Sequence, residues 1–134
     1  MELPALITCP LVYFTIAEEI TLSIGFIFLW ILHYFNRTII YPSRIKTKGK
    51  KIPIAIVSSA FFFNLVNGIL NGYFLSLIKF ESISELYLII GFVIFFIGFY
   101  INVSSDDILI KLRTNQKGYI IPEGGLFNYV SCPN

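Results

Sequence analysis

Three stretches of this sequence carry no charge and are long enough to cross a lipid bilayer. They cover residues 20–36, 52–78 and 86–105, which makes 17, 27 and 20 residues. The hydrocarbon core of a bilayer is about 30 Å thick, and a helix of roughly 20 residues spans it. Because lipid offers no partners to backbone N–H and C=O groups, apolar runs of this length cross it as helices. We therefore predict an all-α, multi-pass transmembrane helical bundle with about three spanning helices.

Prolines and charges predict where these helices begin and end. We expect one membrane domain over residues 1–134, with spans over about 20–41, 52–78 and 86–105. Pro42 should stop the first span, because proline has no N–H and clashes with the preceding turn, and Pro53 suits the first turn of the second. Residues 3–16 are apolar but short and contain two prolines, so we expect a re-entrant or interfacial segment there. The composition agrees, since 13% of the residues are charged against about 25% in soluble domains.

The charges of the connecting loops predict the orientation in the membrane. Residues 37–51 contain six Lys and Arg and no acid. Cytoplasmic loops carry such an excess of positive charge, so the basic loop 42–51 is expected on the cytoplasmic side. Residues 79–85 are net negative and should be lumenal, and the third helix then returns to a cytoplasmic loop over 106–125. The same basic loop could also attract a phosphorylated ligand.

Polar side chains recur at helical spacing where the third span ends. At 100° per residue, Asn102, Asp106 and Arg113 fall within about 40° of one another on one helix face. Such groups are costly near lipid unless they face protein, water or a ligand. Arg113 could hold a phosphate, Asn102 and Asp106 could bind amide or ribose groups, and Tyr119 could stack or hydrogen-bond. The alternative is a plain helix end, with the adjacent aspartates capping it or pairing with Lys111.

The first and second spans carry polar groups as well. Tyr34, Arg37 and Tyr41 share one helix face, where a tyrosine beside a base can act as a proton donor. The alternative is an interfacial aromatic belt with a snorkelling arginine. The second span carries an asparagine stripe with glycines beside it, at Asn64, Asn67, Gly68, Asn71 and Gly72. We interpret Asn64 and Asn71 as residues of helix–helix packing, in which small residues allow close approach and amides bond across. Asn67-Gly68 fits that interpretation less well, but its pattern alone does not define a site.

Several kinds of site are not indicated. The sequence has no G-x-G-x-x-G after a strand and no P-loop, so neither nucleotide-binding fingerprint is present. His33 is the single histidine, and Cys9 and Cys132 are far apart, so no metal site is expected. The cysteines are interpreted as small apolar fillers. We expect the bilayer as a partner, and no nucleic acid.

Three blocks of the chain form one recognisable pattern. The blocks are Glu2-Leu3-Pro4; His33-Tyr34-Phe35-Asn36-Arg37-Thr38 with Tyr41-Pro42; and Ile101-Asn102 through Ser105-Asp106, Leu112-Arg113, Gly118-Tyr119, Ile121-Pro122, Gly124-Gly125-Leu126-Phe127 and Tyr129 to Asn134. In order and spacing they resemble the steroid 5α-reductase family, the 3-oxo-5α-steroid 4-dehydrogenases, which include plant brassinosteroid-pathway members. The Phe63-Asn64 and Asn67-Gly68 region fits this family too.

The resemblance implies a multi-pass endoplasmic-reticulum enzyme that binds NADPH from the cytoplasmic side. Such enzymes pass a hydride to the β-carbon of a 3-oxo-Δ4 steroid, and a proton goes to the α-carbon. Glu2 and Tyr34 match the pair that binds and polarises the ketone oxygen. The positions that match residues around the cofactor are Arg37, Tyr41, Asn102, Asp106, Arg113, Tyr119 and Asn134.

Two alternatives stay open beside this hypothesis. Enoyl-CoA and polyprenol reductases share the general plan, although the Gly124-Gly125-Leu126-Phe127 block favours the steroid branch. A catalytically inactive membrane protein that acts as a partner or regulator is the other. The resemblance also implies a fragment that lacks the family's first and last transmembrane helices. We therefore expect the 134-residue chain alone to be inactive.

Overall fold

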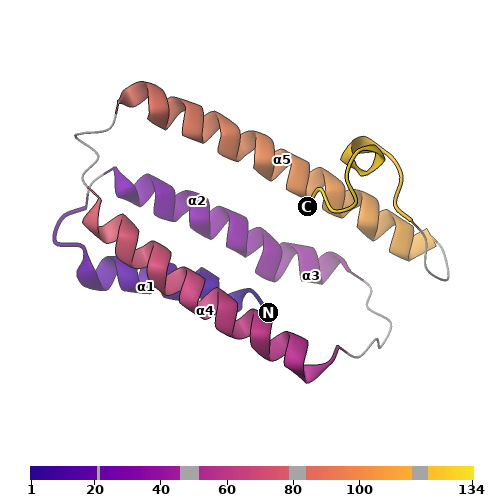
Figure 1. Cartoon of the computed structure of the whole chain (residues 1–134), viewed down its shortest axis with the longest axis horizontal. Coiled ribbons are helices and arrows are strands. Elements are labelled where there is room, and N and C mark those ends of the chain that lie inside the picture. Colours follow the sequence, from indigo (N-terminus) through magenta and orange to yellow (C-terminus); the bar gives the residue numbers. More distant parts are fainter. Residues whose placement is uncertain (21, 46–51, 79–83, 116–120) are drawn as a thin grey trace. The chain divides into compact units, whose positions relative to one another are not determined.

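The computed structural model describes residues 1–20, 22–45, 52–78, 84–115 and 121–134, apart from the side chains of residues 113–115. All regular structure in these residues is helical (Figure 1), which confirms the predicted all-α class. The chain forms two compact units, Met1–Ser43 with Gly49–Ile83 and Arg44–Lys48 with Ser84–Asn134. Three helices in the described residues are long and apolar enough to cross a membrane, Ser23–Arg44, Ile54–Leu77 and Glu85–Leu112, as predicted.

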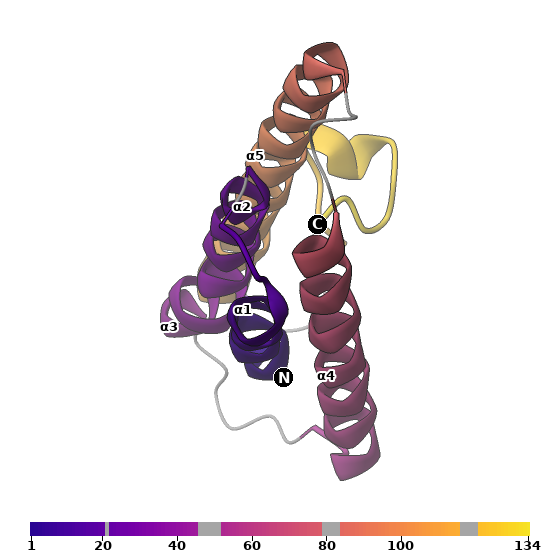
Figure 2. The ribbon, with the colours of Figure 1, turned by 90° about the vertical axis from the view of Figure 1, so that its left-hand side faces the viewer.

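The first unit is built around the contact between its first and last helices. Its elements are α1 (Leu3–Ile16), α2 (Ser23–Phe35), the π-helical turn η1 (Asn36–Ile40), most of α3 (Tyr41–Arg44) and α4 (Ile54–Leu77). The helix α1 is too short to span a membrane and packs chiefly against α4 (Figure 2).

Two glycines of α4 allow this close approach. A Cβ built on Gly72 would lie 2.5 Å from the carbonyl oxygen of Cys9, and one built on Gly68 would overlap the hydroxyl of Thr8. The glycines of the predicted stripe therefore do serve helix–helix packing.

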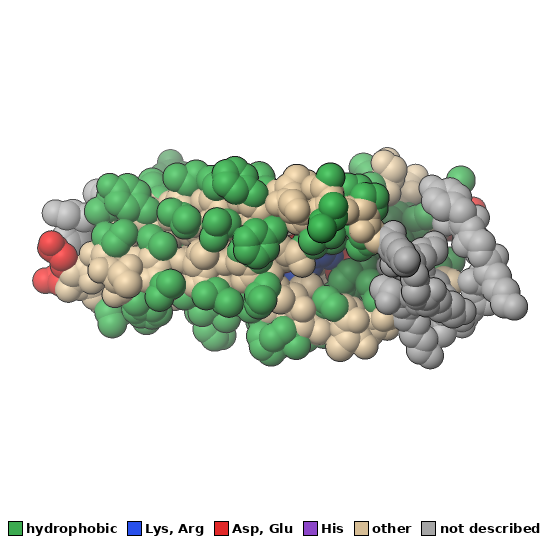
Figure 3. Space-filling view, turned by 90° about the horizontal axis from the view of Figure 1, so that it is seen from below, with side chains coloured by type: hydrophobic (Ala, Val, Ile, Leu, Met, Phe, Trp, Pro, Cys, Tyr) green, Lys and Arg blue, Asp and Glu red, His purple; other side chains and the backbone are tan. Residues whose placement is uncertain are grey.

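The interior of the first unit is small and contains polar links. Cys9 and Tyr13 of α1 are fully buried against Ile27 of α2. The Tyr13 hydroxyl and the hydroxyl of Ser23 lie 2.6 Å apart and share a hydrogen bond. Many apolar side chains also lie on the surface seen in Figure 3. Exposing them to water would be costly, whereas contact with lipid is favourable.

The first span does not stop at Pro42, and that prediction was wrong. The π-helical turn η1 precedes Pro42, and in it the N–H of Tyr41 bonds to the carbonyl of Asn36, five residues back. Helical structure then continues through α3 to Arg44. A proline ring normally clashes with the carbonyl four residues before it, and the wider turn shifts the hydrogen-bond ladder just ahead of the ring. The π-turn thus lets the helix run through the proline.

The second unit consists mainly of one long helix, α5 (Glu85–Asn115), which outlasts the span predicted to end at residue 105. Residues 99–117 contain neither Gly nor Pro, so no helix breaker intervenes. The loop expected over residues 106–125 therefore begins as helix, which continues to Asn115. The 3₁₀ turn η3 (Gly125–Asn128) packs on α5, preceded by Gly124 at φ 97°, which favours glycine.

Candidate functional site

Tyr34 lies at the centre of a polar cluster in the first unit. Its hydroxyl accepts a hydrogen bond of 3.0 Å from Nδ2 of Asn67, which comes from α4. One turn earlier on α2, the ring of Trp30 lies 4.7 Å from the Tyr34 ring, and the His33 ring meets it edge-on at 5.2 Å. The phenol is therefore held between aromatic rings and a single amide donor from a second helix.

Asn67 is itself held by a neighbour on the same helix. Asn71 lies one turn further along α4, and its Nδ2 donates to Oδ1 of Asn67 at 3.0 Å and to the backbone carbonyl of Asn67 at 2.8 Å. Asn64 bonds instead to the carbonyl of Ala60 at 2.9 Å, within α4. The predicted bonding of amides across helices is thus made by Asn67, whereas Asn64 and Asn71 bond within their own helix.

Glu2 forms an ion pair with Arg37, one helical turn beyond Tyr34. Nε of Arg37 lies 3.4 Å from Oε2 of Glu2, and Nη2 lies 3.5 Å from Oε1. These distances are longer than the 2.7–2.9 Å that is usual for a charged hydrogen bond. Oε2 is also buried and accepts no hydrogen bond from the described residues. The Glu2 carboxylate is thus neutralised by Arg37 but keeps an acceptor position for a ligand.

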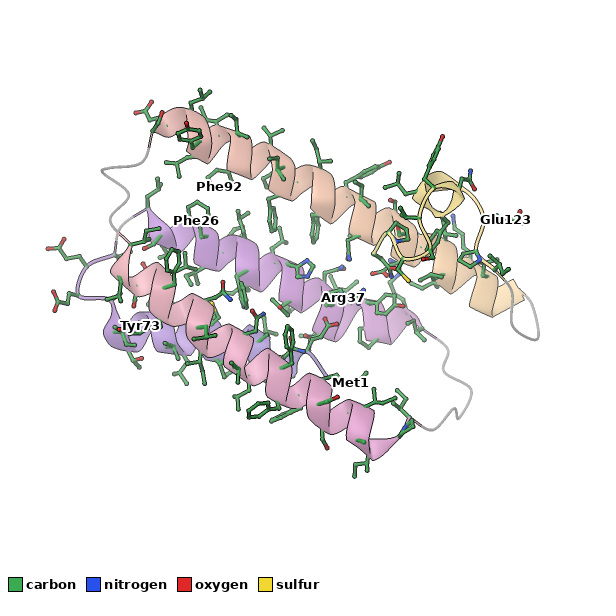
Figure 4. The ribbon with its side chains drawn as sticks, viewed as in Figure 1. Met1, Phe26, Arg37, Tyr73, Phe92 and Glu123 are labelled. Carbon is green, nitrogen blue, oxygen red and sulfur yellow. The ribbon has the colours of Figure 1, made fainter. Side chains whose placement is uncertain are left out.

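The arginine and the N-terminal helix are fixed by aromatic side chains. The guanidinium carbon of Arg37 lies 5.0 Å from the centre of the Tyr41 ring, a cation–π distance. The indole N–H of Trp30 donates to the carbonyl of Ala5 at 2.8 Å and so ties the first turn of α1 to α2. Figure 4 shows Arg37 and Met1 at the same end of the unit. The four predicted residues of this unit, Glu2, Tyr34, Arg37 and Tyr41, are therefore brought together.

The second unit contains another polar cluster on α5. Asp106 is buried, with 2% of its surface exposed, and its Oδ1 accepts a hydrogen bond of 2.7 Å from Nδ2 of Asn134. One turn before it, Oδ1 of Asn102 is buried and accepts no hydrogen bond from the described residues. The chain's last described segment thus folds back onto the polar face of α5. This cluster unites three predicted residues and leaves one acceptor open.

The alternative interpretation of this helix end was that its aspartates cap the helix or pair with Lys111. Asp107 forms an ion pair with Arg44, Oδ1 to Nη2 at 2.7 Å, and not with Lys111. Arg113 lies on α5 within the predicted face, but its side chain is outside the described residues. Tyr119 lies outside them entirely. Among the described residues, no group of three His, Cys, Asp or Glu is arranged to hold a metal ion.

The sequence pattern set Asn67 apart from Asn64 and Asn71 only weakly, and Asn67 was not among the predicted site residues. Its signal was present, because an asparagine within an uncharged span is costly unless it has a partner. The spacing of the stripe could not separate it from Asn64 and Asn71, since all three share one face. Only the position of α4 against α2 decides which amide meets Tyr34.

Comparison with known proteins agrees with these observations. Residues 50–134 match the model of the 3-oxo-5-alpha-steroid 4-dehydrogenase family. Since this match covers more than half of the chain, the protein belongs to that family, and the resemblance seen in the sequence is confirmed.

Individual relatives come from plants and animals. Steroid 5-alpha-reductase DET2 of Arabidopsis thaliana is 44% identical over 115 residues, covering 78% of this chain and 44% of the relative. DET2 of Solanum lycopersicum is 36% identical along the whole chain and 54% of its own length. Human 3-oxo-5-alpha-steroid 4-dehydrogenase 1 is 36% identical over 110 residues, 79% of this chain and 42% of the relative. The chain thus spans about half the length of these curated relatives.

Proposed function

We propose that this protein takes part in the NADPH-dependent reduction of the Δ4 double bond of a 3-oxo steroid. The observation that carries the proposal is the Tyr34 hydroxyl, which accepts from Asn67 one helical turn from the Glu2–Arg37 pair. Two relatives' names describe the same chemistry, steroid 5-alpha-reduction and 3-oxo-5-alpha-steroid 4-dehydrogenation.

The proposed chemistry requires a donor at the ketone oxygen. When hydride adds to the β-carbon of an enone, negative charge develops on that oxygen. The O–H of Tyr34 would donate to it and stabilise the enolate, as donors do in oxyanion holes. From the family resemblance, Glu2 would be the second side chain at the ketone. It would need to carry a proton there, because a ketone oxygen only accepts hydrogen bonds and an ionised carboxylate has no hydrogen to donate. A proton from solvent water would then add to the α-carbon, which completes the saturated product.

The second unit offers groups that fit the cofactor. The buried Oδ1 of Asn102 is an open acceptor, suited to an amide or amino N–H of a dinucleotide. Asp106, which already accepts from Asn134, would support that face. NADPH would supply the hydride when bound. For Arg37, Tyr41, Arg113, Tyr119 and Asn134, contact with the cofactor stays a prediction from the family resemblance.

The proposal includes a location. Three membrane-spanning helices and membership of this family support the endoplasmic-reticulum membrane, with the basic loop 42–51 on the cytoplasmic side. That loop lies partly outside the described residues, so the proposed orientation rests only on its excess of positive charge.

Microsomes test the proposed activity. The protein as its gene encodes it is expressed in yeast microsomes and given a 3-oxo-Δ4 steroid with NADPH or NADH, and the 4,5-dihydro product is quantified by mass spectrometry. We expect product with NADPH, and none from the 134-residue chain expressed alone. Absence of product from the encoded protein would favour the inactive-partner alternative, and reduction of only an enoyl-CoA or a polyprenol would favour the related reductases.

A matched pair of tyrosine variants tests the role of Tyr34. Tyr34→Phe removes one donor and should lower kcat about 100-fold, the usual effect of losing one oxyanion-hole donor. Tyr100→Phe is the control, because Tyr100 is 74% exposed on α5. Equal activity of the two variants would contradict the assignment of Tyr34.

A further inference from the structure

We infer that Asn67 is a positioning residue that aims the Tyr34 proton at the substrate, and that Asn71 sets the orientation of Asn67. This inference rests on the proposed reduction at Tyr34, and it adds two residues to that site. Both asparagines come from α4, whereas the phenol that they orient comes from α2.

One backbone carbonyl decides which atom of each side-chain amide is the nitrogen and which is the oxygen. Asn71 lies 2.8 Å from the backbone carbonyl oxygen of Asn67, which can only accept, so the nearer atom of Asn71 must be its Nδ2. The same Nδ2 lies 3.0 Å from a side-chain atom of Asn67. Two amide nitrogens cannot bond there, so that atom is Oδ1. The remaining atom of Asn67, its Nδ2, then faces Tyr34.

The direction of the Tyr34 proton follows in turn. A phenol has one hydrogen to donate and lone pairs to accept with. Since Asn67 donates to the oxygen at 3.0 Å, the O–H bond must point away from Asn67. Among the described residues, the hydrogen bond recorded at this oxygen is the one that it accepts from Asn67. The proton is therefore left for a ligand oxygen.

The amides also strengthen Tyr34 as a donor. Hydrogen bonds in series polarise one another, and the effect is larger where the surroundings have a low dielectric constant. A donor on the phenol oxygen pulls electron density from the O–H bond, which makes that hydrogen a better donor to a developing enolate. Without Asn67 the hydroxyl would lose the hydrogen bond that limits its rotation, and its hydrogen would no longer be aimed in one direction.

Asn64 supplies the matched control on the same helix. It has the same side chain and lies close to Asn67 in sequence, but its Nδ2 bonds to the carbonyl of Ala60 at 2.9 Å. Asn64→Ala thus removes an equivalent amide from α4 without touching Tyr34. Asn67 is replaced by Ala and by Leu, because Leu removes the donor while keeping most of the volume.

A double-mutant cycle tests whether Asn67 acts through Tyr34. We expect Asn67→Ala and Asn67→Leu to lower kcat about tenfold with KM nearly unchanged, and Asn71→Ala to lower it less. In the Tyr34→Phe background, Asn67→Leu should change kcat less than about twofold, because the group it orients is gone. Equal fold-losses in both backgrounds would overturn the inference.

A spectroscopic measurement separates this inference from the proposed function. The protein is labelled with ¹³C at Cζ of tyrosine, and the Tyr34 resonance is identified by its absence in Tyr34→Phe. Asn67→Leu should shift this resonance, whereas Asn64→Ala should leave it in place. A resonance that moves in neither variant overturns the inference, whether or not steroid is reduced. A shift in Asn67→Leu alone, in a protein without turnover, supports the inference and counts against the steroid reaction only.

Discussion

Replacing Gly72 by alanine should loosen the packing of α1 on α4. A Cβ at this position would lie 2.5 Å from the carbonyl oxygen of Cys9, whereas ordinary contacts begin at 3.4 Å. The two helices must therefore separate by about 0.9 Å, the difference between these distances. The clash is with backbone, which cannot rotate aside as a side-chain end can.

The expected cost comes from strain and lost contacts. Forcing one extra carbon into a well-packed interface costs about 1–3 kcal/mol. A gap of 0.5–1 Å forfeits a quarter to a half of the dispersion energy of the atoms that it separates. Alanine also has a helix propensity about 1 kcal/mol more favourable than that of glycine. Gly98→Ala is the control, because in the described residues nothing lies within 4 Å of a Cβ there.

Unfolding by SDS in mixed micelles measures the effect. Trp30 is the single tryptophan and is bonded to Ala5 of α1, so its fluorescence reports on the attachment of α1. We expect Gly72→Ala to unfold at lower SDS than Gly98→Ala, with a difference of roughly 1–3 kcal/mol. Both variants gain the same helix propensity, so the difference between their free energies of unfolding reports the packing of α1 on α4. Unfolding of Gly72→Ala at the same or higher SDS than the control would refute this account of the interface.

Three further predictions concern other parts of the chain. A maleimide at pH 8 should label Cys132, which is exposed, and spare Cys9, because burial raises the pKa of that thiol to about 12; equal labelling would contradict the packing of α1. Asn134→Asp should release the segment 121–134, because it replaces the amide that donates to Asp106 at 2.7 Å by a second carboxylate. Amide hydrogen exchange over 121–134 should then be at least about fivefold faster than in the wild type, and unchanged exchange would contradict the contact. Single cysteines placed in the loop 42–51 should react with an impermeant reagent in sealed microsomes, and protection until detergent is added would reverse the predicted orientation.

Much of the fold was predictable because lipid imposes simple requirements. A long uncharged run must be a helix, so the three spans could be predicted from length and charge alone. The end at Pro42 could not, because a proline usually stops a helix and the π-turn that accommodates it has no clear sequence signal. The extension of α5 to Asn115 follows from the absence of Gly and Pro between Gly98 and Gly118.

The candidate site was predictable only in part. Spacing on one helix identified the face shared by Asn102 and Asp106, and the family resemblance pointed to Glu2 and Tyr34. The partners of these residues lie far away in sequence, with 32 positions between Tyr34 and Asn67 and 34 between Glu2 and Arg37. Such pairings depend on how helices pack, and periodicity within one helix carries no information about that.

The sequence by itself determined that this protein is a helical membrane protein of the 3-oxo-5-alpha-steroid 4-dehydrogenase family, because hydropathy and motifs are local properties of the chain. Only the tertiary structure decided which of three equivalent asparagines meets Tyr34, and that Gly72 allows α1 to lie against α4. The physical reason is that a helix fixes the face on which a side chain lies, whereas the helix opposite decides what that face touches. The direction of the Tyr34 proton is set across that contact, by an amide of α4.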